Sequence, residues 1–213
     1  MRLLVMATAF AAVLSVGLPA KAAFLGSQYD PAGVGNINSL NQAKMIVEDF
    51  VGPPTSRFRA TRLDFPENSN NISSSVSLST FLGSNGTLLS GADSVMQTTV
   101  TMITGILNLD PGTYTFSVGS DDGYELLFGN QLVSQRTTNR GFQTDNTQVT
   151  VQAGDNQFFQ LLYWENLGQT GLRFSINGVV VDQNFTDVPL PAGLPLMLAG
   201  LGMIAVWRRG TKA

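Results

Sequence analysis

The stretch that decides the fold is GTYTFSVGSDDGYELLFGNQLV, residues 112–133. In its first half, Tyr114, Phe116 and Val118 alternate with threonine and serine. This period of two is typical of a β-strand with one buried face. A second apolar run ends at Phe128, directly before a Gly-Asn-Gln segment that favours a tight turn. The stretch therefore predicts consecutive strands with a glycine-flanked Ser-Asp-Asp-Gly loop between the first two.

The same pattern continues on both sides of this stretch. A long apolar run from 95 to 109 ends in the turn sequence DPGT, and three later strand-like runs are separated by AGDN and by a loop ending in glycine. Short strands separated by turn residues about every 8 to 12 positions predict an antiparallel β-sandwich.

The N-terminal part predicts a single helix, over SLNQAKMIVEDFVG at 39–52. Ser39 is a good N-cap, apolar residues recur at helical spacing, and Gly52-Pro53-Pro54 end the run. The next segment, 57–65, alternates like a strand after one slip, and 67–81 is a polar loop or edge rich in Ser and Asn. We expect a mainly β fold with one short N-terminal helix.

Composition limits the chemistry that is open to this chain. It contains no cysteine and no histidine, which excludes disulfides, histidine general bases, Cys/His nucleophiles and zinc sites with nitrogen and sulfur ligands. A hydrolase that uses carboxylates alone remains possible. Residues 23–187 carry seven of the twelve Lys and Arg and all fifteen Asp and Glu, a formal charge of −8. A surface of that sign argues against a nucleic-acid partner and favours cations or neutral sugars.

The adjacent carboxylates Asp121 and Asp122 are the main candidates for a functional site. Like charges so close repel, so either full solvation or a cation must compensate them. Ca²⁺, which takes about six to eight oxygen ligands, suits an acidic loop. Asp and Gly are also ordinary turn residues. On these residues alone, a solvated turn and a cation site both remain open.

Two quoted segments resemble one known family. YTFSVGSDDGYELLFGNQLV at 114–133, followed by VTVQAGDNQFFQLLYWENLGQTGLRFSI at 149–176, is similar to the PA14 β-sandwich shared with flocculins and GLEYA lectins. The resemblance covers about residues 95–181. In sugar-binding members, the two aspartates are joined by a cis peptide, bind one Ca²⁺ and leave coordination open for sugar hydroxyls. Carried over, these are Asp121 and Asp122.

The resemblance also implies the rest of the site. A later loop supplies a third ligand, an asparagine in flocculins, and Glu165 stands at that position here; a glutamate is an equally good hard oxygen donor. Backbone carbonyls near Leu167 and Gln169 would complete the shell. Trp164 or Tyr124 would stack on a sugar face. 

Four residues are therefore the predicted sugar contacts: Asp121, Asp122, Trp164 and Asn166. The loops 135–146 and 166–170 around the metal would set the sugar specificity.

The N-terminus predicts export. Arg2, the apolar run 3–18 and an Ala-Lys-Ala cleavage pattern ending at Ala22 form a secretory signal peptide over 1–22. The remaining domain would then span 23–187.

The C-terminal segment, 188–213, combines a proline-containing start, an uncharged run from Gly193 to Trp207 and the basic pair Arg208-Arg209. The pattern predicts a membrane-inserted segment with its basic end in the cytoplasm. The segment resembles the PEP-CTERM sorting signal in its VPLPA variant, formed by Val188, Pro189, Leu190, Pro191 and Ala192 with Arg208 and Arg209. That resemblance implies a Gram-negative host and an exosortase, a membrane protease that processes an inner-membrane-anchored precursor. Leu190 departs from the commoner glutamate, and a permanent anchor is the alternative.

Three functions follow from these patterns. The first is a calcium-dependent carbohydrate-binding module displayed on the cell surface or in the extracellular matrix, with a glycan or exopolysaccharide as its partner. The second is a structural surface or matrix protein that binds no sugar. The third, a carboxylate glycosidase, is disfavoured because such enzymes place two carboxyls about 5 to 9.5 Å apart across a cleft. We expect no enzymatic activity.

Overall fold

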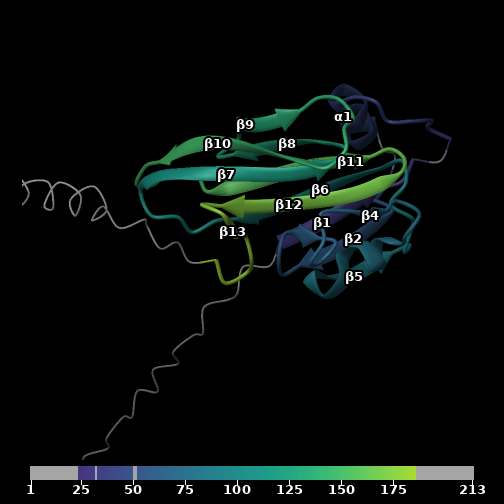
Figure 1. Cartoon of the computed structure of the whole chain (residues 1–213), viewed down its shortest axis with the longest axis horizontal. Helices are drawn as coiled ribbons and strands as arrows, with labels where there is room; N and C mark the ends of the chain where they lie inside the picture. The colour runs from purple at the N-terminus through teal and green to yellow at the C-terminus, as the bar shows by residue number, and fades with distance from the viewer. Residues whose placement is uncertain (1–23, 32, 50–51, 186–213) are drawn as a thin grey trace, which may run out of the picture.

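The computed structural model describes residues 24–31, 33–49 and 52–185, which form a sandwich of two antiparallel sheets (Figure 1). The predicted signal peptide and the predicted sorting segment lie outside these residues. Within the described part of the chain, no helix has the length and hydropathy needed to cross a membrane.

The larger sheet has seven strands in the order β5-β2-β1-β6-β11-β8-β9. Their bounds are β1 Phe24–Tyr29, β2 Ser56–Ala60, β5 Gly86–Gly91, β6 Thr99–Ile106, β8 Gly123–Phe128, β9 Gln131–Arg136 and β11 Phe158–Glu165. Strand β1, which the sequence patterns did not predict, lies between β2 and β6 in this sheet.

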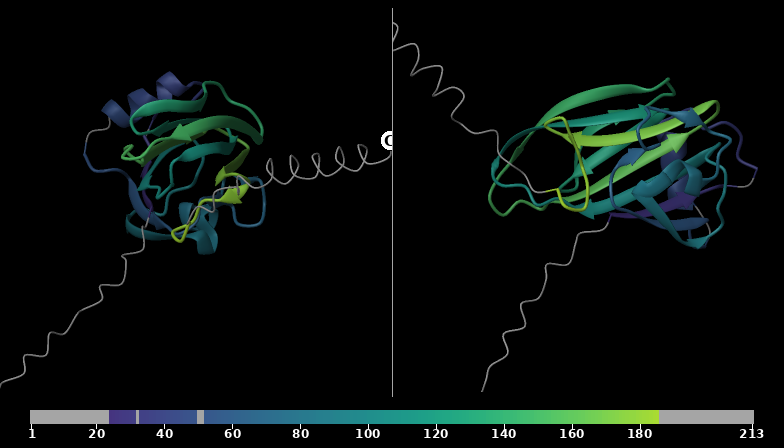
Figure 2. Two further views of the ribbon diagram at one scale, coloured as in Figure 1. Left: turned by 90° about the vertical axis from the view of Figure 1, so that its left-hand side faces the viewer. Right: turned by 60° about the horizontal axis from the view of Figure 1, so that its bottom comes forward.

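The smaller sheet is built on the path β10-β7-β12-β13, and two short strands, β3 and β4, also pair with β12. The bounds are β3 Asp64–Phe65, β4 Ile72–Ser73, β7 Gly112–Asp121, β10 Gln143–Val151, β12 Gln169–Ile176 and β13 Val179–Val180. Figure 2 shows the two sheets stacked on each other.

The main core fills the space between the sheets. Phe116 contacts Phe128 of the facing sheet edge-on at 5.4 Å between ring centroids, and it contacts Phe174 of its own sheet at 5.6 Å. Tyr114, Phe116 and Val118 are all buried in this core, so the alternation that the sequence showed is confirmed. The mainly β, antiparallel sandwich is confirmed with it.

The predicted helix is present as α1, Leu40–Asp49, and the Ser39 hydroxyl accepts a hydrogen bond from the backbone of Gln42 at 3.3 Å. The helix packs on the outer face of the seven-stranded sheet, in a second cluster that includes Ala43 and Trp164 (Figure 1).

The interpretation of 67–81 as a loop or edge was incomplete. The segment contains β4 and most of a second helix, α2, Leu78–Leu82, which continues into a short 3₁₀ turn, Gly83–Asn85. Ser77 caps α2, and Leu78, Phe81 and Leu82 are buried. Spacing of three and four residues puts these side chains on one face, which explains a helix in an otherwise polar segment.

Candidate metal centre

One end of the sandwich gathers the three predicted metal ligands. Asp121 ends β7 and pairs with Gly171 of β12, while Glu165 ends β11 of the other sheet. Carboxylate oxygens of Asp121, Asp122 and Glu165 all lie within 4.8 Å of one another. The prediction that Glu165 lies beside the aspartate pair is confirmed. The peptide bond between Asp121 and Asp122 is cis, as the resemblance implies.

Glu165 is the most deeply placed of the three, with no exposed surface. Its Oε2 accepts a hydrogen bond from the Tyr163 hydroxyl at 3.2 Å, while its Oε1 is buried with no hydrogen-bond partner within 3.5 Å among the described residues; the buried hydroxyl of Ser74, likewise without a partner within that distance, still helps to lower the pKa of Glu165. Burial, and then the charges of Asp122 and Asp121, raise the pKa of Glu165 to about 9. A buried carboxylate oxygen without a donor is uncommon, because its desolvation is then uncompensated.

Backbone amides partly compensate Asp122. Its Oδ1 accepts from the amide of Arg140 at 3.2 Å, and its Oδ2 accepts from the amide of Asn166 at 2.8 Å. Burial nevertheless dominates, and together with the charge of Asp121 it raises the pKa of Asp122 to about 6. The pKa of Asp121 is also raised, mainly by burial. The fold therefore holds three carboxyl groups close together, and this arrangement destabilises their ionised forms.

This donor set fits a hard divalent cation. The three carboxylates supply only oxygen, which Ca²⁺ prefers, and in the described part of the chain no donor lies within 3.5 Å of Glu165 Oε1 to compete with a metal. A bound cation would reverse the electrostatic cost that raises the three pKa values. Asp121, Asp122 and Glu165 are the residues that would hold it.

The sequence reasoning missed Asn71, which reaches the cluster from the segment treated as a polar loop. Its Nδ2 donates to Asp121 Oδ2 at 3.2 Å and to the side-chain oxygen of Gln169 at 2.9 Å. β4 follows it directly and pairs with the start of β12, which fixes the segment beside the site. No local pattern could reveal this contact, because it joins residues 50 positions apart.

The predicted stacking role of Trp164 is wrong. The residue has no exposed surface, packs beneath α1 and donates its ring N–H to Asn139 at 2.9 Å. Tyr124, the alternative, is likewise fully buried, with its hydroxyl bonded to Ser134 and Asp145. Both aromatics therefore support the loops around the site from inside and offer no ring face to a sugar.

Asn166, the remaining predicted sugar contact, is only partly buried, and its side-chain oxygen accepts from the amide of Ile37 at 3.2 Å. Its neighbour Leu167 is 48% exposed and is the apolar surface that this loop presents.

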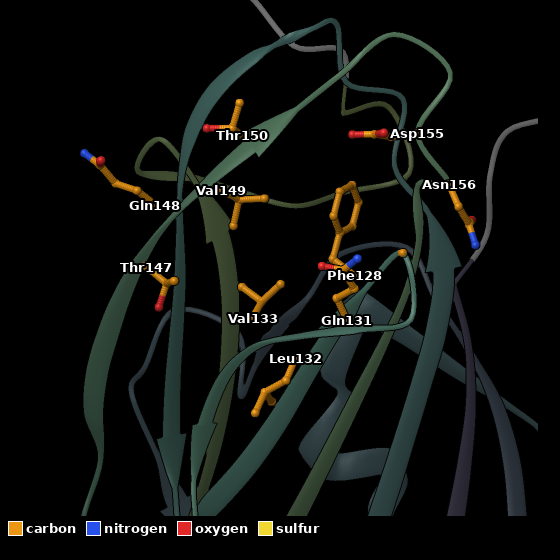
Figure 3. Close-up of a pocket in the computed structure, with 11 residues that line it drawn as sticks. Phe128, Gln131, Leu132, Val133, Thr147, Gln148, Val149, Thr150, Asp155 and Asn156 are labelled. Atoms are coloured by element: carbon orange, nitrogen blue, oxygen red, sulfur yellow. The ribbon is translucent and has the colours of Figure 1, made fainter.

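A separate cleft of about 390 Å³ lies at the other end of the sandwich, between β10 and the β8–β9 hairpin (Figure 3). Phe128, Val133 and Val149 point into it from the edge of the core. Two of its polar groups serve the local turns, since Asp155 Oδ2 accepts from the amide of Gln152 and Asn156 Oδ1 accepts from that of Phe158. Unlike Glu165, the described residues that line this cleft include no buried side-chain oxygen or nitrogen without a hydrogen-bond partner.

Comparison with solved structures identifies the fold. The chain is similar to a PA14 sugar-binding domain from an RTX adhesin, with a TM-score of 0.63 and 23% identity over 76% of this chain and 95% of that one. It is similar to the PA14 domain of the antifreeze protein MpAFP, with a TM-score of 0.65 and 22% identity over 75% and 87% of the two chains. No protein-family model and no curated protein sequence matches it. At this identity, the likeness establishes a PA14-like fold.

Proposed function

We propose that this protein is an exported surface or matrix protein whose PA14-like domain binds glycans through calcium held by Asp121, Asp122 and Glu165. The observation that carries the proposal is the convergence of three buried carboxylates, one of which has an oxygen with no hydrogen-bond partner within 3.5 Å among the described residues. The sugar-binding domain of an RTX adhesin has a similar fold, which supports carbohydrate as the ligand class.

The bound ion would supply coordination positions for sugar hydroxyls, which are neutral oxygen donors of the kind that Ca²⁺ accepts. The protein's own groups would orient the sugar. Asn71 and Gln169, hydrogen-bonded to each other on one side of Asp121, present amides for further hydroxyl contacts. Leu167, half exposed beside Asn166, offers an apolar contact for the C–H face of a ring.

We also propose that the domain has no hydrolytic activity. The carboxylate oxygens lie within 4.8 Å of one another, closer than the about 5 to 9.5 Å by which glycosidases separate their acid and their nucleophile or base. Three acids this close suit one shared cation better than opposite faces of a sugar.

A glycan array tests the binding proposal directly. The immobilised glycans should retain the purified protein in Ca²⁺ and release it in chelator, and Asp122→Asn should not be retained even in Ca²⁺. Asp155→Asn, in the distant cleft, serves as the matched loss of a carboxylate and should bind like the wild type. Retention that survives both chelator and Asp122→Asn would place sugar binding elsewhere. No retention in Ca²⁺ would favour the structural alternative.

For the C-terminal segment, which lies outside the described residues, we propose sorting by an exosortase in a Gram-negative host. The motif at 188–192 and the basic pair Arg208-Arg209 support this. Protein isolated from the native cell surface or matrix should have a mass that lacks the segment after about Pro191, whereas a host without an exosortase should keep it. Extracellular protein that still contains Arg208 and Arg209 would instead indicate a permanent anchor.

A further inference from the structure

Arg140 lies in the loop between β9 and β10, and its side chain is buried, with only 5% of its surface exposed. Its guanidinium contacts both carboxylate oxygens of Asp145, at 3.1 Å from Nη1 and 2.7 Å from Nη2. Nη2 also donates to Ser120 Oγ at 3.2 Å and to the carbonyl of Gln143 at 3.0 Å. A planar fork with several fixed donors is well suited to holding one segment in a single position.

The loop that this side chain fixes supplies backbone donors to both aspartates. The amide of Arg140 itself donates to Asp122 Oδ1 at 3.2 Å, and the amide of Phe142 hydrogen-bonds Asp121. Ser120 adds a third link, because its hydroxyl, which accepts from Arg140, donates to the backbone carbonyl of Asp122 at 2.8 Å. The guanidinium is therefore linked to the aspartate pair directly through Ser120, and the loop that it fixes adds two backbone amides.

Packing of Phe142 against β7 and β12 also holds the loop between β9 and β10 in place. The ring of Phe142 lies so close to β7 and β12 that a Cβ would come within 2.5 Å of it at Gly119 and 3.0 Å of it at Gly171. The guanidinium of Arg173 lies 6.0 Å from the centre of this ring. The absence of side chains at two strand positions thus creates the space that lets the loop reach the acids.

The positive charge of Arg140, taken alone, would disfavour a cation at this site. A positive charge near three carboxylates lowers the pKa of Asp121 by stabilising its ionised form, but it repels an incoming cation. A residue kept for charge alone would therefore weaken calcium binding.

We infer that Arg140 is a positioning residue for the calcium site: it holds the loop 137–143 so that two backbone amides orient the carboxylates of Asp121 and Asp122 toward Glu165. The inference rests on the proposed calcium function. Partners that orient metal ligands typically change metal affinity by about 10- to 100-fold when removed. The effect expected here is a loss of affinity on removing a positive charge.

Calcium titration of the full chain by calorimetry tests this, with Arg140→Ala, Arg140→Lys and Arg136→Ala as variants. Arg136 is exposed at the end of β9, so its loss matches the charge change and leaves the hydrogen bonds of Arg140 in place, although its charge also acts on Asp145. We expect Arg140→Ala to weaken Ca²⁺ binding about 10- to 100-fold and Arg136→Ala to leave it unchanged or slightly tighter. Arg140→Lys should fall between wild type and alanine, because a lysine reaches Asp145 or Ser120 and not both. Unchanged or tighter binding in Arg140→Ala would overturn the inference.

Hydrogen exchange in chelator supplies a readout that needs no metal. The amides of Arg140 and Phe142 should exchange at least about tenfold faster in Arg140→Lys than in wild type, while the amides of β7 and β11 keep their protection. Unchanged exchange at 140 and 142 would overturn the positioning role. If wild type binds no Ca²⁺, the proposed function fails, and this exchange measurement still decides whether Arg140 positions the loop.

Discussion

The two ends of the sandwich differ in a way that locates the candidate site. At the end where β7 meets β8, three carboxylates are buried together, and none of the residues described by the structure places a donor within 3.5 Å of Glu165 Oε1. At the other end, the cleft beside Phe128 is spacious, yet Asp155 and Asn156 are bonded to their own turns. A buried carboxylate oxygen without a hydrogen-bond partner among the described residues thus lies at the acidic end and not in the cleft of about 390 Å³.

This difference shows that a buried polar group without a hydrogen-bond partner locates a candidate site better than the size of a cleft does. Desolvating a carboxylate costs free energy that a fold offsets with donors or with a counter-charge. Around Asp155, short-range turn hydrogen bonds provide the donors. Around Glu165, two of the neighbours are other acids, and the hydroxyls of Tyr163 and Ser74 offset its burial only in part, so a bound cation is the compensation that we propose.

The largest expected difference between the two ends is the contribution of calcium binding at the acidic end to the stability of the fold. A cation that binds only the folded state adds about 2.7 kcal/mol at a hundredfold excess over its Kd. The full chain should therefore melt several degrees higher in Ca²⁺ than in chelator, measured by differential scanning calorimetry. Asp122→Asn should remove most of that difference, and Asp155→Asn should keep it. If the wild type melts at the same temperature in both buffers, the acidic end binds no Ca²⁺ and does not differ from the cleft end in this respect.

The pH dependence sharpens the comparison. In chelator, the raised pKa values of Glu165, about 9, and Asp122, about 6, mean that the folded state keeps protons that the unfolded state has released. Stability should therefore fall as pH rises from about 4.5 toward 9. Glu165→Gln removes the larger part of this loss and should stabilise the chelated protein by about 1 to 3 kcal/mol at pH 8. The same variant should lose calcium stabilisation.

Denaturant titrations at pH 5 and pH 8 measure this effect, with Asp155→Asn as the matched loss of a carboxylate outside the acidic cluster. A chelated wild type that gains stability with pH would show that the three acids are compensated without a metal.

Much of this architecture follows from local sequence. The alternation of Tyr114, Phe116 and Val118 predicts β7 because period-two burial is a property of neighbouring residues. Helix α1 follows from its Ser39 cap and apolar spacing. The acidic pair stands out locally as two adjacent like charges, whereas Glu165 was found through a family pattern that places strands in a known order, since nothing local joins residues 121 and 165.

The parts that sequence reasoning missed depend on distant contacts. Asn71 reaches Asp121 because β4 pairs with β12, and Arg140 is fixed by Ser120 and Asp145 across two strands. Trp164 was misassigned because alternation tells which side of a strand a residue lies on, and not that α1 covers that side. Burial of the outer face is a tertiary property.

A smaller effect should come from Asn71→Ala. This variant removes the amide that donates to Asp121 and contacts Gln169, and a single hydrogen bond to a charged group contributes about 1.5 to 3 kcal/mol. Because Asn71 is partly exposed, we expect a loss near the lower end of this range. Calorimetry should show calcium affinity reduced about tenfold. Asn156→Ala, at the cleft, is the paired control. If both variants bind Ca²⁺ equally well, Asn71 has no part in the site.

The smallest effect is expected inside the cleft. Gln131→Ala replaces an exposed side chain that lines it, and such surface changes usually alter stability by less than about 0.5 kcal/mol. Glycan retention and calcium affinity should both stay at wild-type values. A loss of glycan retention with calcium affinity intact would show that the hollow end takes part in binding after all.

The most direct test is a crystal structure of the protein grown in Ca²⁺, with anomalous diffraction used to locate the ion. The account predicts one anomalous peak about 2.3 to 2.6 Å from carboxylate oxygens of Asp121, Asp122 and Glu165. Crystals grown in saturating Ca²⁺ that show no peak at these three side chains would contradict it.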